Sequence, residues 1–198
     1  MKIRIVFTYA FLLLSILGCK PIIYTIHDVR QVKPQSDEDL IRFCRQKHME
    51  TQQLKRVRQE VLDSNLRKHL NQHYLFDSTG QMVDYAASFE NPRCKGNLLQ
   101  LLKTPDTLKT FPRNSAFTLE SILDHTLEVN HWPESSAAGI QATYTIVMYW
   151  NTFSGNPNHK KAFSDLNEAI QHAPHGMFRL LLINQDFHPG NIPSIQMK

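Results

Sequence analysis

The sequence predicts an α/β fold, chiefly because two apolar runs of strand length flank a helical segment. Residues 143–150 are an almost unbroken series of β-branched, apolar and aromatic side chains, as expected for a strand covered on both faces. Residues 177–184 form a second such run. Between them, Pro157 begins a predicted helix whose apolar side chains recur at helical spacing to residue 173. This order predicts two parallel buried strands joined by a crossover helix.

The composition is that of an ordinary globular protein. The 198 residues are 41% hydrophobic and 20% charged, with 7 glycines and 10 prolines, which excludes collagen-like, low-complexity and polytopic membrane proteins. Lys and Arg number 22 against 18 Asp and Glu, so the formal net charge is only +4. So small an excess gives no electrostatic signature of nucleic-acid binding, and no nucleic acid is expected as a partner.

The first residues have the layout of an export signal. Lys2 and Arg4 precede an apolar stretch at residues 5–17, which Gly18 and Cys19 follow. As a helix, a stretch of this length reaches about 20 Å, less than the roughly 30 Å of a bilayer's hydrocarbon core. A transmembrane anchor is therefore the weaker interpretation.

The small Gly18 directly before Cys19, with branched apolar residues at the two preceding positions, resembles the lipobox of bacterial lipoproteins. The resemblance implies that residues 1–18 are a signal peptide and that Cys19 is the first mature residue, its thiol carrying diacylglycerol with fatty acids such as palmitate. It also implies a lipid-anchored protein of the bacterial cell envelope, and Lys20 after the cysteine favours the outer membrane. A plain secretory signal with an accidental cysteine is the alternative.

The mature chain is expected to begin with a lipidated tether at residues 19–35, followed by a helical region at residues 36–73. Ser36 is the predicted N-cap, and Asp39 stands at the N3 position of a box-like capping motif. A roughly helical stripe of apolar residues then predicts one long amphipathic helix or a pair of helices.

This helical region is the most basic part of the mature chain. Two interpretations remain open: a solvated helix face, or a face that binds anionic headgroups or another anionic polymer. The basic residues are Arg42, Arg45, Lys47, Lys55, Arg56, Arg58, Arg67 and Lys68.

Residues 74–198 are expected to form one α/β domain. Residues 74–85 are predicted to form a hairpin, with Gly80 at the left-handed position of an Asp-Ser-Thr-Gly turn. Residues 98–103 are expected to form a short helix, and residues 118–129 a longer one that Thr118 or Ser115 caps.

The segment from residue 143 to residue 186 is similar to the thioredoxin family. In that family a strand ends in Trp, a loop holds Cys-Gly-Pro-Cys at the start of a helix, and the next strand closes in a Leu-Asn-Ile-Asp-like sequence. This chain has Tyr149-Trp150, then Ser154, Gly155 and Pro157, and later Leu182-Ile183-Asn184-Gln185-Asp186. The resemblance implies a partial thioredoxin-like sheet with flanking helices.

Further along, Ile192-Pro193-Ser194 resembles the family's Ile-Pro-Thr segment. Few residues follow it, so the two closing strands and the last helix of the family have little room at this end. Part of that layer is therefore expected to be absent or to be supplied by the N-terminal half.

The thioredoxin-like loop lacks the residues that thiol exchange needs. Disulfide exchange requires a thiolate and a resolving thiol, but Ser154 stands at the first cysteine position and no cysteine follows it. No catalytic residue is therefore assigned to this loop. Cys44 and Cys94 are the thiols left after lipidation, and they are expected either to form a structural disulfide or to remain two separate cysteines.

Neither a metal site nor a cofactor is expected. His69 and His73 are four apart on a predicted helix, but no third ligand has diagnostic spacing, so a solvated helix surface is favoured. The sequence therefore predicts a membrane-anchored envelope lipoprotein with a redox-inactive thioredoxin-like domain that binds an envelope protein or has a structural role. The alternative is an envelope thiol-disulfide oxidoreductase that uses Cys44 and Cys94.

Overall fold

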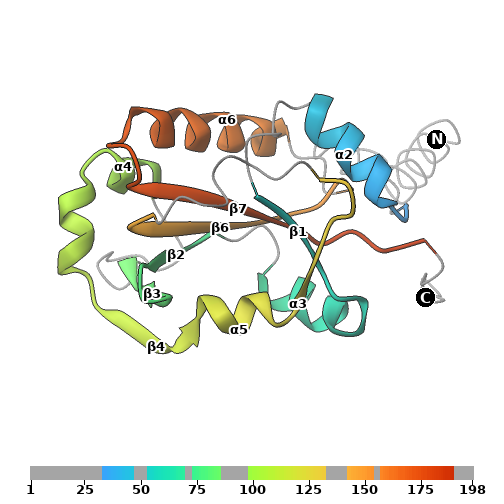
Figure 1. Cartoon of the computed structure of the whole chain (residues 1–198), viewed down its shortest axis with the longest axis horizontal. Helices are drawn as coiled ribbons and strands as arrows, with labels where there is room; N and C mark the ends of the chain where they lie inside the picture. Colours follow the sequence, from blue (N-terminus) through green and yellow to red (C-terminus); the bar gives the residue numbers. More distant parts are fainter. Residues whose placement is uncertain are drawn as a thin grey trace, which may run out of the picture.

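The protein forms a seven-stranded mixed sheet with helices on both faces, so the predicted α/β class is confirmed (Figure 1). The computed structural model describes residues 33–46, 53–69, 73–85, 98–132, 142–153 and 157–189, with the backbone alone for residues 157–162. The strand order is β4-β3-β2-β6-β7-β1-β5. The strands are β1 (Gln53–Val57), β2 (His73–Asp77), β3 (Gln81–Val83), β4 (Arg113–Thr118), β5 (Thr126–Glu128), β6 (Tyr144–Trp150) and β7 (Phe178–Asn184).

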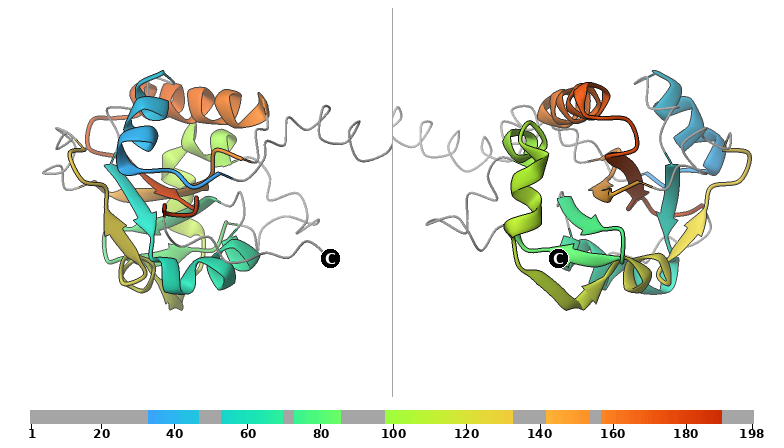
Figure 2. Two further views of the ribbon diagram at one scale, coloured as in Figure 1. Left: turned by 90° about the vertical axis from the view of Figure 1, so that its right-hand side faces the viewer. Right: turned by 60° about the vertical axis from the view of Figure 1, so that its left-hand side comes forward.

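Helices cover both faces of the sheet (Figure 2). The sheet therefore separates the apolar core into two layers, one beneath each set of helices. Apolar side chains of α2, α4 and α6 pack on one face, and those of α3 and α5 pack on the other. None of the described helices is long and apolar enough to span a membrane. The helices are α2 (Asp37–Gln46), η1 (Gln59–Val61), α3 (Leu62–His69), α4 (Leu98–Leu102), η3 (Pro105–Thr110), α5 (Leu119–Leu123) and α6 (Pro157–His172).

The centre of the sheet is the predicted parallel pair. Every residue of β6 is buried, and β6 pairs with β7 in parallel from Tyr144 opposite Phe178 to Trp150 opposite Asn184. Successive β6 side chains alternate between the two cores, Met148 on one face and Tyr149 on the other. The crossover helix α6 begins at Pro157, as its fixed φ and missing N–H favour.

Residues 36–73 do not form one long helix; they contain the helices α2 and α3, as the alternative prediction had it, but with a strand between them. Between α2 and α3 the chain forms the strand β1, which pairs in parallel with β7 and antiparallel with β5. Leu54 and Val57 are three apart, which fits a helical stripe, but they point into opposite cores, as the period of a strand requires. β1 therefore belongs to the same sheet as β5 and β7, and α2 and α3 pack on that sheet and are not a separate helical region.

The predicted basic helix face does not form among the described residues. Arg42 and Arg45 are exposed on α2, whereas Arg67 and Lys68 are exposed on α3, on the opposite side of the sheet. Arg56, on the strand between them, is buried. The basic residues are thus distributed over α2, β1 and α3, because a strand replaces the middle of the expected helix.

The hairpin prediction is confirmed. β2 and β3 are joined by a turn in which Gly80 has a φ of 78° and donates its N–H to the Asp77 carbonyl at 2.9 Å. The Asp77 carboxylate accepts the backbone N–H of Thr79 at 3.0 Å and Nε of Arg113 at 2.7 Å. One acidic side chain therefore holds the turn and joins it to β4.

The predicted helix at residues 118–129 is much shorter than expected. Thr118 caps it, since its Oγ1 accepts the Ser121 N–H at 3.2 Å, but α5 ends at Leu123. The following residues form β5, in which Leu127 lies opposite Arg56 of β1. Pairing with a distant strand thus overrides the local helical pattern. The short helix expected at residues 98–103 is confirmed as α4.

Candidate functional site

A cleft of about 530 Å³ opens beside the carboxyl end of β6. In open α/β sheets, ligands bind outside the carboxyl ends of the strands, and this volume lies within the usual range of ligand pockets. We call it the β6 cleft. It is lined by Lys33, Gln35, Asp39, Arg42, Phe43, Gln46, Thr152 and Phe153.

Trp150, the last residue of β6, supports one wall of the cleft. Its indole is 3% exposed and stacks on the ring of Phe43, with 5.3 Å between ring centroids and 19° between planes. Phe43 is half-buried and lines the cleft, whereas Trp150 packs behind Phe43 and does not line the cleft itself. Trp150 thus fixes the position of α2 over the end of the sheet.

Asp186 holds the segment of the cleft wall that contains Thr152. The backbone N–H of Thr152 donates to its Oδ1 at 3.0 Å and to its Oδ2 at 3.1 Å, and Nδ2 of Asn184 donates to Oδ2 at 2.8 Å. The residue is 3% exposed. Burial raises the pKa of the Asp186 carboxyl above its ordinary value, although the hydrogen bonds from Asn184 and Thr152 and the charge of Arg56 act to lower it.

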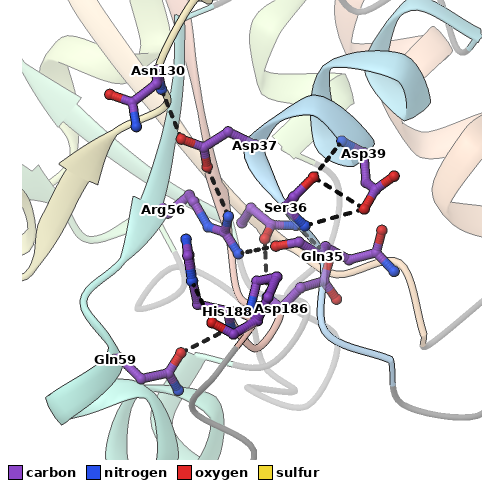
Figure 3. A network of polar contacts seen from close by, with 11 residues as sticks. Gln35, Ser36, Asp37, Asp39, Arg56, Gln59, Asn130, Asp186 and His188 are labelled. Atoms are coloured by element: carbon purple, nitrogen blue, oxygen red, sulfur yellow. Dashed lines mark hydrogen bonds and ion pairs between the residues drawn. The ribbon is translucent and has the colours of Figure 1, made fainter.

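A second buried carboxylate, Asp37, joins α2 to β1. Nη1 of Arg56 donates to Asp37 Oδ1 at 2.8 Å, Nη2 of Arg56 donates to the Gln35 carbonyl at 2.8 Å, and the Asn130 N–H donates to Asp37 Oδ2 at 2.9 Å (Figure 3). Burial acts to raise the pKa of Asp37, but the hydrogen bonds from Arg56 and Asn130 outweigh it and hold that pKa below its ordinary value. The base of α2 is therefore fixed to the sheet.

The lining of the cleft combines cations with aromatic rings. Asp39 accepts the N–H and the hydroxyl of Ser36 at 3.3 and 3.1 Å, while its own N–H donates to Ser36 Oγ at 3.2 Å, which confirms the predicted capping motif. Its other oxygen lies 3.5 Å from Nη1 of Arg42. Among the described residues Lys33 forms no ion pair, so the lining carries an excess of positive charge.

The structure describes only part of the predicted site. Trp150 lies at the cleft, and Pro157 starts α6. Ser154, Gly155, Cys19 and Cys94 lie outside the described residues. Cys44 is on α2 with an exposed fraction of 0%, in the core between α2 and the sheet.

His69 and His73 do not share a helix. His69 ends α3 and His73 begins β2, so the expected solvated helix surface was wrong. His69 Nδ1 is 2.8 Å from the hydroxyl of Tyr74, and its ring stacks on Tyr149 at 4.9 Å. Burial raises the pKa of Tyr74 to about 12, so its hydroxyl stays protonated at neutral pH.

Across the described ranges no three His, Cys, Asp or Glu side chains are grouped as a metal site would require.

Sequence reasoning missed the residues that shape the cleft. Asp186 was noted only as part of the thioredoxin resemblance, and Arg56 only as one of several cations. One signal was available: Asn184 ends a buried strand, Gln185 and Asp186 follow it directly, and all three polar residues are themselves buried. Such residues at the carboxyl end of a parallel strand indicate a site.

Comparison with known proteins finds no matching family model, no similar curated protein and no solved structure that matches.

Proposed function

We propose that this chain is a cell-envelope lipoprotein, held on the membrane through Cys19, whose thioredoxin-like domain binds an envelope protein in the β6 cleft and does not exchange disulfides. One observation carries the binding role. The cleft wall that follows Trp150 consists of Thr152 and Phe153, and Ser154 comes next where thioredoxins hold their attacking thiol. The two residues before the position that performs chemistry in the resembled family line a cleft, and the sequence has no thiol at that position.

The strand order supports the thioredoxin-like interpretation. β6, α6 and β7 supply the strand-helix-strand unit, and β1 continues the parallel part of the sheet beyond β7. On the other side of β6, the hairpin of β2 and β3 lies antiparallel. This hairpin occupies the side where the resemblance calls for two closing strands, and it comes from the N-terminal half of the chain.

The lipid anchor is supported by the sequence alone. Several acyl chains on Cys19, at about 0.8 kcal/mol per buried methylene, would hold the protein on a membrane without help from the fold. Lys20 favours the outer membrane. Arg56 binds the carbonyl of Gln35, at the end of the proposed tether, so the tether would join the domain beside the cleft.

The oxidoreductase alternative is not favoured by the position of Cys44. A reactive cysteine requires a thiolate that its partner can reach, whereas Cys44 is 0% exposed in an apolar core. Insulin reduction by the purified protein, abolished by Cys44→Ser or Cys94→Ser, would nevertheless restore that alternative.

The anchor is tested by replacing Cys19 with Ala in cells. We expect the wild-type protein in the outer-membrane fraction, with a mass increase equal to a lipid group on Cys19, and the variant in the soluble envelope fraction. Equal membrane retention of both proteins, with no lipid on the wild type, would contradict the lipoprotein assignment.

The binding role is tested with soluble protein that begins at Lys20 and an array of peptides from envelope proteins. Arg42→Ala and Phe153→Ala change the cleft lining, and Arg67→Ala removes an exposed arginine of α3 on the other face. Peptides bound by the wild type should bind the two cleft variants about tenfold more weakly, a loss of about 1.4 kcal/mol, and the α3 variant equally well. Equal binding to all four proteins would overturn the cleft as the site.

A further inference from the structure

The β6 cleft has one wall whose position depends on a single buried carboxylate. Thr152 lines the cleft, and its backbone N–H donates to both oxygens of Asp186. The segment between Trp150 and Phe153 is thus held at its centre by an acidic side chain that lies 34 residues further along the chain.

The groups around this carboxylate suit its ionised form best. Thr152 N–H donates to both carboxylate oxygens, Asn184 Nδ2 donates to Oδ2, and the Asn184 side-chain carbonyl is already used by the N–H of Asp186 at 3.0 Å. A protonated carboxyl group has its own O–H to donate and has lost acceptor capacity. A proton on Oδ1 therefore removes one of the two acceptors of the Thr152 N–H and places a donor against it, which weakens the bond to Thr152.

The charge balance of the surrounding cluster favours uptake of a proton. Asp186 is 3% exposed as a residue, and the side chains of Arg56 and Asp37 are 6% and 11% exposed, so two carboxylates lie near one guanidinium in a largely buried region. Arg56 donates to Asp37 and Gln35 and acts on Asp186 only through its charge. One negative charge is thus left without a hydrogen-bonded cation, an arrangement that proteins relieve by binding a proton.

One charged group from a neighbouring element acts on Asp186, namely Arg56 of β1. Arg56 is in turn paired with Asp37 of α2. The segment after β7 contributes His188, which is exposed and lowers the pKa of Asp37 through its charge. The loop after β6 and the end of β7 contribute Thr152 and Asn184, which do not titrate.

We propose that Asp186 makes the β6 cleft sensitive to pH: when its carboxylate takes up a proton, the N–H of Thr152 is released and the wall formed by Thr152 and Phe153 loses its position. Ligand binding in the cleft then weakens as the pH falls. This regulatory role rests on the proposed binding function, but the release of Thr152 can be measured without any ligand.

The first measurement is amide hydrogen exchange at Thr152 in the chain that begins at Lys20. After correction for the intrinsic exchange rate, protection of this amide should fall by about tenfold as the pH decreases from neutral to the ordinary Asp pKa of about 3.9. Asp186→Asn keeps a side-chain oxygen acceptor but cannot titrate, so its Thr152 protection should not depend on pH. Asp124→Asn, at an exposed position after α5, is the matched control and should behave as the wild type.

A fluorescence measurement gives an independent readout. The chain has two tryptophans, so Trp132→Phe leaves Trp150 as the only indole, two residues from Thr152. Quenching of Trp150 by acrylamide should increase on acidification with the midpoint found by hydrogen exchange. Asp186→Asn in the same background should remove that transition.

If Asp186→Asn does not fold, the wild-type chain still decides the proposal. The carboxyl ¹³C shift of Asp186 and the amide ¹H shift of Thr152 must then titrate with one midpoint, and different midpoints would overturn it. An unchanged pH dependence in a folded Asp186→Asn variant would also overturn it. A pH-dependent Thr152 amide in a protein that binds no peptide would count against the proposed binding function alone.

Discussion

The guanidinium of Arg56 and the carboxylate of Asp37 meet at 2.8 Å in a buried ion pair that joins β1 to α2. The Arg56 side chain is 6% exposed and that of Asp37 is 11% exposed. Each needs the other, because a charge in such surroundings costs several kcal/mol unless it is paired and hydrogen-bonded. The pair therefore connects a helix and a strand that the sequence analysis assigned to one helical region.

Arg56→Met is expected to destabilise the protein by about 3–5 kcal/mol, because it leaves Asp37 buried without its cation. The double variant Arg56→Met with Asp37→Leu should recover much of that loss. The measurement is urea unfolding of the chain that begins at Lys20. Arg58→Met, at a side chain that is 43% exposed, is the control and should change the stability by less than about 1 kcal/mol. A cost no larger than that of the control would contradict the buried-pair argument.

The parts of the fold that the sequence predicted are those with strong local signals. β6 and β7 are continuous apolar runs, Pro157 starts α6, and the Asp-Ser-Thr-Gly turn requires a hairpin. β1 was missed because its five residues include Lys55 and Arg56, and because the ion pair that permits burial of Arg56 depends on a carboxylate 19 residues away.

The candidate site was less predictable than the fold because it, too, depends on contacts between residues that are far apart in the sequence. The resemblance to thioredoxins drew attention to the loop after Trp150, and the structure does put one wall of the cleft there. The role of Asp186 could not be read from the sequence, because it depends on the distance to the Thr152 amide in a neighbouring loop. Long-range hydrogen bonds of this kind leave no periodic pattern.

Asp77 should make the protein less stable in acid. Burial acts to raise its pKa, but hydrogen bonds from Thr79, Arg113 and Gln81 outweigh this and hold the pKa below its ordinary value of 3.8. Its stabilising contribution is therefore complete above about pH 4 and is lost as the pH falls through the lowered folded-state pKa. The difference in unfolding free energy between wild type and Asp77→Asn should shrink as the pH decreases from about 5 to about 2. A difference that stays constant over this range would contradict the assignment.

Gly80→Ala should cost about 1–2 kcal/mol through the backbone alone. Gly80 has a φ of 78°, which L residues rarely adopt, whereas an added Cβ would lie 3.8 Å from Leu119 Cβ, an ordinary contact. Gly176, with a φ of 75° and open space around its Cβ position, is the matched control. Ala at either position should therefore cost a similar amount in urea unfolding, and Asn, which tolerates this conformation, should cost less. A much larger cost at Gly80 would indicate a steric clash instead.

Cys44 should react with thiol reagents only when the protein opens. Its exposed fraction is 0%, and it packs in the core between α2 and the sheet. In the reduced chain that begins at Lys20 and carries Cys94→Ser, Cys44 is the single thiol. We expect labelling by a disulfide reagent to be about a thousandfold slower in buffer than in urea, because an opening free energy of about 4 kcal/mol limits access.

A reference thiol makes this prediction decisive. Ser78 is exposed in the turn between β2 and β3, so Ser78→Cys in a Cys44→Ala, Cys94→Ser background should label at the same rate with and without urea. If Cys44 in the native protein labels as fast as this reference, its thiol is accessible at neutral pH. The main physical requirement of the oxidoreductase hypothesis would then be met, because an accessible thiol could form the thiolate that disulfide exchange needs.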